Sequence, residues 1–126
     1  MEFKQVHHVA IIASDYEKTI EFYVKKLGFE ILRENHRPEK NDIKIDLKFG
    51  NQELEIFILP NAPKRPNYPE ALGLRHLAFK VDNVETMAAW LNERGIETEP
   101  IRFDTYTNKR MTFFKDPDGL PLEIHE

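Results

Sequence analysis

Apolar and polar residues follow each other in the same order in both halves of the chain. In the first half, apolar residues at helical spacing predict a helix that starts at the capping pattern Ser14-Asp15-Tyr16-Glu17 and ends at Gly28. Alternating runs around this helix predict four strands, at Phe3–Ala13, Phe29–Glu34, Ile43–Phe49 and Glu53–Leu59. The first half therefore predicts a β-α-β-β-β module.

The second half repeats this order after a proline-rich segment. A helix is predicted between the capping pattern Asp82-Asn83-Val84-Glu85 and Gly95, with strands at Leu74–Val81, about Glu97–Phe103, Lys109–Phe114 and Leu120–His125. Residues 60–73 hold four of the eight prolines, which neither donate to a sheet nor continue a helix. We therefore expect one domain, residues 1–126, made of module one (about 1–59), a linker (about 60–73) and module two (about 74–126).

An offset of 68 residues relates the two modules and singles out four polar residues. It places His8 on His76 and Glu55 on Glu123, so that each module has one histidine and one glutamate 47 residues apart. Strand alternation puts these residues on the face opposite the helix, and it prefers His8 to His7 for that face. A single such residue is usually an ordinary core or surface residue. The repeated spacing instead favours metal ligands, because converging carboxylates need a compensating charge.

Two neighbours of these residues are weaker candidates. Glu53 shares the predicted face of Glu55, but its counterpart in the second module is Pro121, which cannot bind a metal. His125 shares the face of Glu123 and is expected at the rim of the site.

The same alternation gives a candidate substrate pocket. It predicts the following side chains on the metal-binding face: Arg110, Thr112 and Phe114 in the second module, and Lys44 and Asp46 as matches from the first. Arg110 is the residue suited to a substrate carboxylate, because a guanidinium presents a fork of donors. Residues Arg102–Arg110 read equally well as a substrate-facing loop and as a solvated hairpin.

Composition narrows the class of protein and the kind of metal site. The 126 residues are 40% hydrophobic and 32% charged, with a net charge of −4, and no apolar run approaches the roughly 20 residues of a membrane span. No secretory signal is visible, so we expect a cytoplasmic protein. Interspersed charges argue against a nucleic-acid partner. Since cysteine is absent, any metal must be bound through nitrogen and oxygen.

The strand sequences HHVAI and RHLAF and the closing DPDGLPLEI, together with the two modules, resemble the vicinal oxygen chelate superfamily and its small glyoxalase I-like bacterial members. The resemblance covers essentially the whole chain. It implies an α+β fold in which tandem βαβββ modules form an open, barrel-like mixed sheet. It also implies one divalent metal ion in the concave groove, bound by His8, Glu55, His76 and Glu123.

This ligand set implies a metal-dependent lyase or isomerase, similar to lactoylglutathione lyase. Four protein ligands on an octahedral ion leave two adjacent positions for a substrate with vicinal oxygens. The metal would stabilise an enediolate while a glutamate transfers a proton beside a carbonyl, and either Glu123 or Glu55 would be that base. Nickel or zinc is expected, and cobalt, manganese and iron also accept these ligands.

Other functions remain open at this stage. An acyl-thioester epimerase fits the four ligands nearly as well, whereas a ring-cleaving dioxygenase uses two histidines and one carboxylate. A thiol transferase for an antibiotic resembles a three-ligand pattern. A ligand-binding or antibiotic-resistance module would use the same groove without chemistry. We expect a homodimer, and the linker permits a site within one chain or one shared across the dimer.

Overall fold

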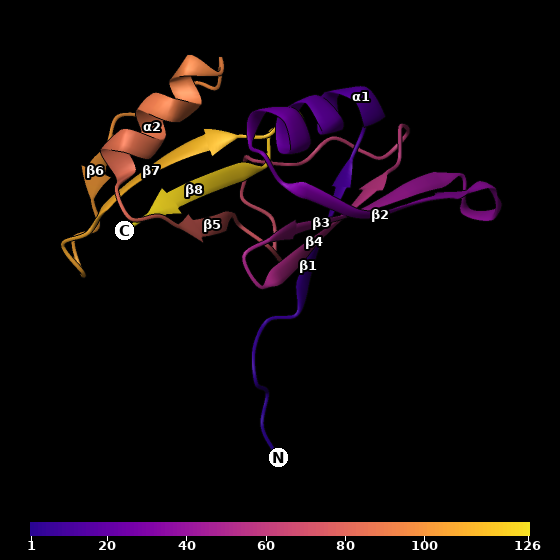
Figure 1. Ribbon diagram of the computed structural model, residues 1–126, viewed down its shortest axis with the longest axis horizontal. Coiled ribbons are helices and arrows are strands. Elements are labelled where there is room, and N and C mark those ends of the chain that lie inside the picture. The colour runs from indigo at the N-terminus through magenta and orange to yellow at the C-terminus, as the bar shows by residue number, and fades with distance from the viewer. The chain divides into compact units, whose positions relative to one another are not determined.

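The computed structural model describes all residues, 1–126, as two compact units, Met1–Pro63 and Lys64–Glu126. Each unit contains one helical segment and one mixed sheet of four strands (Figure 1). The predicted α+β class and the two β-α-β-β-β modules are confirmed. None of the helices has the length and apolar character needed to cross a membrane.

The first unit contains a sheet with the strand order β1-β4-β3-β2. Strands β1 and β4 are parallel, and the other neighbouring strands are antiparallel. Helix α1 continues directly into a π-helical segment, η1, and a short 3-10 helix, η2, separates β2 from β3. The bounds are β1 His8–Ala13, α1 Tyr16–Thr19, η1 Ile20–Lys26, β2 Glu30–Arg37, η2 Pro38–Lys40, β3 Asp42–Phe49 and β4 Gln52–Ile58.

Local signals set both ends of this helical segment. The side chain of Asp15 accepts a hydrogen bond from the backbone amide of Lys18 at 2.8 Å, so Asp15 is the N-cap. Gly28 follows the last helical turn with a φ of 80°, a left-handed conformation that glycine adopts without strain. The first strand begins at His8 and not at Phe3, because the ladder with β4 starts at His8. Residues 1–7 extend away from the first sheet (Figure 1).

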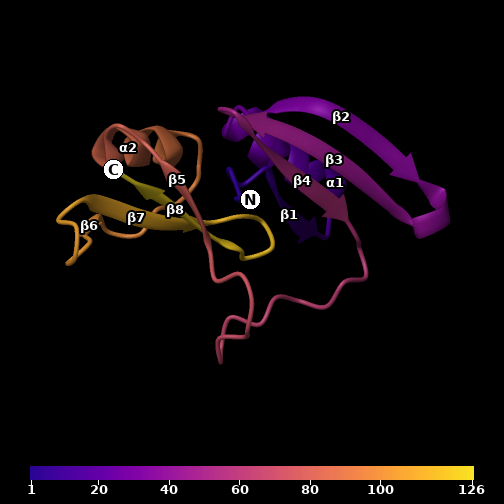
Figure 2. The same ribbon diagram turned by 90° about the horizontal axis from the view of Figure 1, so that it is seen from below.

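The second unit repeats this arrangement with the strand order β5-β8-β7-β6. Its elements are β5 Leu77–Lys80, α2 Val84–Glu93, β6 Arg102–Phe103, β7 Arg110–Lys115 and β8 Pro121–His125. The side chain of Asn83 caps α2 by accepting from the amide of Thr86 at 2.8 Å. The predicted linker contains no helix or strand and traces a long irregular path (Figure 2). Only two residues of the predicted strand Glu97–Phe103 are paired, as β6.

The core of each unit lies on the sheet face predicted to carry apolar side chains. Leu54 and Ile56 of β4 are fully buried, as are Leu122 and, to within 3% exposure, Ile124 of β8. Burial of each such side chain contributes roughly 1.5–3 kcal/mol. Because side chains alternate along a strand, the residues between them point to the opposite face. This alternation places Glu55 and Glu123 on the face away from each core.

Candidate functional site

In the first unit, the sheet brings His8 into contact with Glu55. Strands β1 and β4 are parallel neighbours, and the ladder places Glu55 opposite Ala10, two residues beyond His8 on the same face. The Nε2 atom of His8 lies 3.1 Å from Oε2 of Glu55. The glutamate side chain is largely buried, whereas the histidine ring is open to solvent on one side.

In the second unit, His76 and Glu123 form the same contact. The Nε2 atom of His76 lies 3.0 Å from Oε2 of Glu123, which is buried on β8. The ring of Phe113 packs edge-on against the imidazole of His76, with centroids 5.2 Å apart. The repeated spacing in the sequence thus becomes a repeated histidine–glutamate pair, one in each unit.

The geometry of each pair fits two ligands of one divalent ion. Metal bonds from imidazole nitrogen and carboxylate oxygen are about 2.1 Å long, so ligands at adjacent octahedral corners lie roughly 3 Å apart. The observed separations of 3.1 and 3.0 Å agree with that spacing. Neither unit has a group of three or more histidine, aspartate or glutamate side chains that could hold a metal alone. That both pairs bind the same ion stays a prediction.

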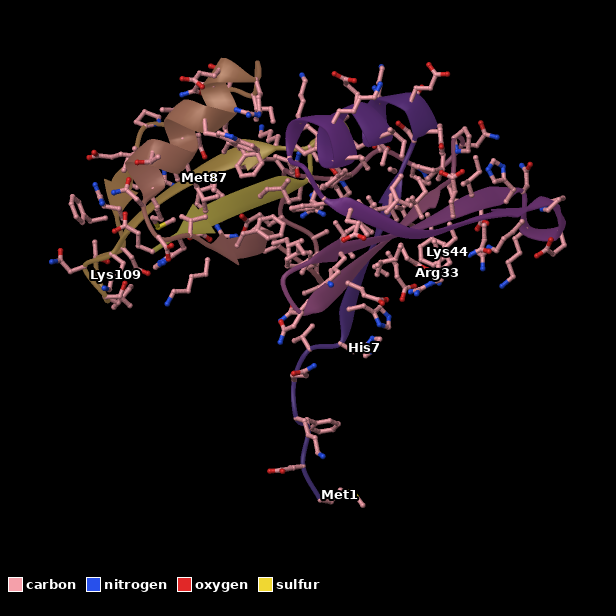
Figure 3. All side chains as sticks on the ribbon, in the orientation of Figure 1. Met1, His7, Arg33, Lys44, Met87 and Lys109 are labelled. Carbon is pink, nitrogen blue, oxygen red and sulfur yellow. The ribbon has the colours of Figure 1, made fainter.

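Glu55 belongs to a network of charged side chains on its face of the first sheet. Lys44 Nζ lies 3.3 Å from Glu55 Oε1, and Asp46 stands directly opposite Glu55 on β3. Asp46 is fully buried and accepts a hydrogen bond from Arg33 Nε at 2.9 Å, which raises the pKa of Arg33. Figure 3 shows Arg33 and Lys44 close together on this sheet. Lys44 and Asp46 therefore lie on the predicted face.

Glu53, the weaker candidate for a metal ligand in the first unit, is paired with Arg33. Both of its carboxylate oxygens accept from Nη2 of Arg33, at 3.1 and 3.0 Å. It also lies opposite His8 in the ladder, yet the imidazole of His8 contacts Glu55. These contacts favour Glu55 over Glu53 as the ligand of the first unit.

The predicted face of three pocket residues in the second unit is wrong. Thr112 and Phe114 are buried on the core side of β7, opposite two core residues of β8, Ile124 and Leu122. Arg110 points to the same side, where its Nη1 lies 3.0 Å from Glu85 of α2 and its Nε donates to Glu126 at 2.6 Å. These three side chains therefore lie on the opposite face of the sheet from Glu123.

The error comes from the lengths of the two hairpin turns. Two residues separate the paired Phe49 and Gln52 in the first unit, whereas five separate Lys115 and Pro121 in the second. An odd difference in turn length changes which residues share a face, so an offset that aligns β4 with β8 misaligns β3 with β7. Phe113 is consequently the residue opposite Glu123.

Sequence reasoning missed Phe113 on the Glu123 face of the second unit, and it named Arg102 only as the start of a candidate substrate-facing loop. Arg102 pairs with Met111 in the ladder, so it shares the face of Phe113. Its guanidinium carbon lies 5.2 Å from the centroid of the Phe113 ring. The alternation from Glu123 back through the turn between Lys115 and Pro121 could have identified Phe113, had the longer turn been counted.

The turn after Arg102 is ordered by its own hydrogen bonds. The carboxylate of Asp104 accepts from the amide of Tyr106 at 2.8 Å, which lowers the pKa of Asp104. The Nε2 atom of His125 lies 3.4 Å from this carboxylate. The pKa of His125 is raised, chiefly by its hydrogen bond to the carbonyl of Glu126. His125 therefore contacts the turn that follows β6.

Residues 5–124 match the family model of the Glyoxalase/Bleomycin resistance protein/Dioxygenase superfamily. The chain belongs to this superfamily, and the resemblance seen in its sequence is confirmed. A solved glyoxalase family protein from Enterococcus faecalis is 71% identical, with a TM-score of 0.96 and complete coverage of both chains. The glyoxalase fold is therefore shared along the whole chain.

The names of other relatives do not point to a single function. The uncharacterized protein YwkD of Bacillus subtilis (strain 168) is 53% identical over 127 residues, covering 100% of this chain and 99% of its own. Lactoylglutathione lyase of Escherichia coli O157:H7 is 27% identical over 94% of this chain and 90% of its own. The structure of TnmS3, an antibiotic binding protein from Streptomyces sp. CB03234, is 26% identical, with a TM-score of 0.71 over 98% of this chain and 96% of its own.

Proposed function

We propose that the protein is a metal-dependent lyase or isomerase of the glyoxalase I type. Its substrate would carry vicinal oxygens, as does the hemithioacetal of a 2-oxoaldehyde and a thiol. The observation that carries the proposal is the histidine–glutamate pair found once in each unit, with nitrogen–oxygen separations of 3.1 and 3.0 Å. Membership of the superfamily and the distant likeness to lactoylglutathione lyase support it.

Under this proposal His8, Glu55, His76 and Glu123 hold one divalent ion, nickel or zinc in the first place. Two neutral imidazoles and two carboxylates balance its charge. When bound, the ion acts as a Lewis acid on the vicinal oxygens of the substrate. Cobalt, manganese and iron accept the same donors, so metal identity is a separate measurement.

Glu123 is the better candidate for the base that moves the proton. Lys44 lies beside Glu55 Oε1 and stabilises its negative charge, so that oxygen is already engaged. In the second unit, Glu123 contacts His76 through Oε2, while Phe113 occupies the place opposite it on β7. Oε1 of Glu123 is thereby left to take the carbon-bound proton of the substrate and return it to the neighbouring carbon.

The first experiment is metal analysis of untagged protein. We expect about one equivalent of a divalent transition metal per chain in the parent, because the four residues hold one ion. His8→Ala and His76→Ala should contain much less. His36→Ala is the matched control, because His36 also pairs with a glutamate, Glu34, at 3.2 Å but belongs to no repeated pair. It should retain the metal content of the parent.

Two outcomes would overturn this assignment. One is a parent protein that takes up none of nickel, zinc, cobalt, manganese and iron on reconstitution. The other is equal metal content in His76→Ala and the parent. With metal bound, the reaction is tested by the isomerisation of hemithioacetals prepared from methylglyoxal and several thiols, followed by ultraviolet absorbance of the thioester product.

A ligand-binding module is the second candidate, favoured by the likeness to the antibiotic binding protein TnmS3 over nearly the whole chain. It predicts binding of a small ligand by protein from which metal has been removed, with no turnover after metal is restored. We also propose a homodimer, because β1, β2, β5 and β6 are the edge strands of their sheets. Light scattering of the purified protein measures its mass directly.

A further inference from the structure

Arg102 differs from the other arginines of this chain because its guanidinium donates no hydrogen bond to a protein acceptor. The other six arginines each donate to a carboxylate, a side-chain amide or a backbone carbonyl, namely Arg33, Arg37, Arg65, Arg75, Arg94 and Arg110. Across residues 1–126, the contact of the Arg102 guanidinium is with the ring of Phe113, 5.2 Å from its centroid. All the donors of the Arg102 fork are therefore available to a ligand.

The position of Arg102 relates this free cation to the candidate site. Arg102 lies opposite Met111, on the sheet face that carries Phe113 and Glu123. The Phe113 ring contacts both the guanidinium of Arg102 and, edge-on at 87° and 5.2 Å, the imidazole of His76. Two side-chain contacts thus link Arg102 to a proposed metal ligand, within one unit.

We propose that Arg102 binds an anionic group of the substrate, a carboxylate, a few bonds away from the vicinal oxygens. This assignment rests on the proposed function, since the vicinal oxygens are the part of the substrate that the metal would hold. A guanidinium pairs with carboxylate or phosphate through two parallel hydrogen bonds, and stacking on an aromatic ring fixes the plane of the fork beforehand. Phe113 is accordingly a positioning residue for Arg102.

The test uses the full chain reconstituted with zinc and dialysed, with zinc content measured first. Isothermal titration then compares 2-oxoglutarate with 2-oxopentanoate, which has the same carbon chain and the same vicinal oxygens but lacks the distal carboxylate. We expect 2-oxoglutarate to bind about tenfold more tightly or better, the effect of one charge-assisted pair. Hydroxypyruvate phosphate is the third ligand, and tighter binding of it than of 2-oxoglutarate would identify the anion as a phosphate.

Variants assign the preference to the arginine. In Arg102→Gln the three ligands should bind with nearly equal affinity, while zinc content and melting temperature stay at parent values because the side chain is exposed. Phe113→Leu retains Arg102 but removes the ring that orients its guanidinium. It should therefore reduce the preference for 2-oxoglutarate over 2-oxopentanoate. Arg75→Gln is the matched control, since Arg75 is an exposed arginine paired with Glu70.

The possible failures are distinguishable. A parent that retains neither zinc nor any of nickel, cobalt, manganese and iron after reconstitution overturns the proposed function. A parent that retains zinc but binds 2-oxoglutarate and 2-oxopentanoate equally overturns the Arg102 assignment alone, as does an Arg102→Gln variant that keeps the preference.

Discussion

Phe113 stands directly opposite Glu123 on the neighbouring strand, in the place that Asp46 takes opposite Glu55 in the first unit. The two glutamates therefore have different surroundings, although each contacts a histidine, at 3.1 Å and 3.0 Å respectively. Glu55 lies among charged side chains, with Lys44 3.3 Å away, whereas Glu123 is buried beside an aromatic ring. The two units thus share a histidine–glutamate pair but differ in what surrounds it, and under the proposed function this predicts different chemical roles for the two glutamates.

This difference predicts unequal effects of two matched substitutions. With metal content equalised by reconstitution, Glu123→Gln should lower kcat of hemithioacetal isomerisation by about 100-fold or more, the usual loss on removing a general base. Glu55→Gln should cost much less in kcat, because under the proposed function Glu55 holds the ion and Glu123 moves the proton. The reverse order of effects would assign the base to Glu55.

A second prediction concerns the two adjacent histidines. His8 contacts Glu55 through Nε2, and its other ring nitrogen, Nδ1, lies 2.9 Å from Nδ1 of His7. His8→Ala should abolish tight metal binding. His7→Ala should weaken it only about tenfold, because His7 orients the ring of His8 without binding the ion. Competition with a chromophoric chelator measures both affinities, and a greater loss in His7→Ala would exchange the two assignments.

The sequence predicted which residues share a face within each strand, but not the register across the hairpin turns. The helices and the module order follow from periodicity, and the structure places His8 in contact with Glu55 and His76 in contact with Glu123. Arg110, Thr112 and Phe114 were placed by carrying alternation across a hairpin whose turn is longer in the second module. Alternation is reliable within a strand, but register across a turn depends on residues whose pairing the sequence does not state. The place of Phe113 was missed for the same reason.

The core faces allow a prediction about stability. Leu122 is fully buried at the centre of the second unit, so Leu122→Ala should lower the free energy of unfolding by roughly 2–5 kcal/mol. Leu72 is fully exposed in the linker, and Leu72→Ala should change it little. Urea denaturation followed by circular dichroism compares the two variants. Equal losses would mean that the linker leucine is buried in solution.

A last prediction concerns the stability that Glu126 contributes and how this contribution depends on pH. The guanidinium of Arg110 and the amide of Val84, at the start of α2, both bind this carboxylate and lower its pKa below the ordinary value of 4.5. The folded chain therefore binds this proton less readily than the unfolded chain does. The stability that Glu126 supplies is complete above its ordinary pKa and is lost as the pH falls through the lowered, folded-state pKa.

Glu126→Gln should accordingly melt at a lower temperature than the parent at pH 7, and the difference should shrink steadily as the pH is lowered from about 5 to 3. Glu2→Gln removes the same charge from the exposed segment before β1, so it should leave the melting temperature unchanged at each pH. Melting curves of the three proteins in one buffer series provide the comparison. A difference between Glu126→Gln and the parent that stays constant across this range would show that the ionised carboxylate does not stabilise the start of α2.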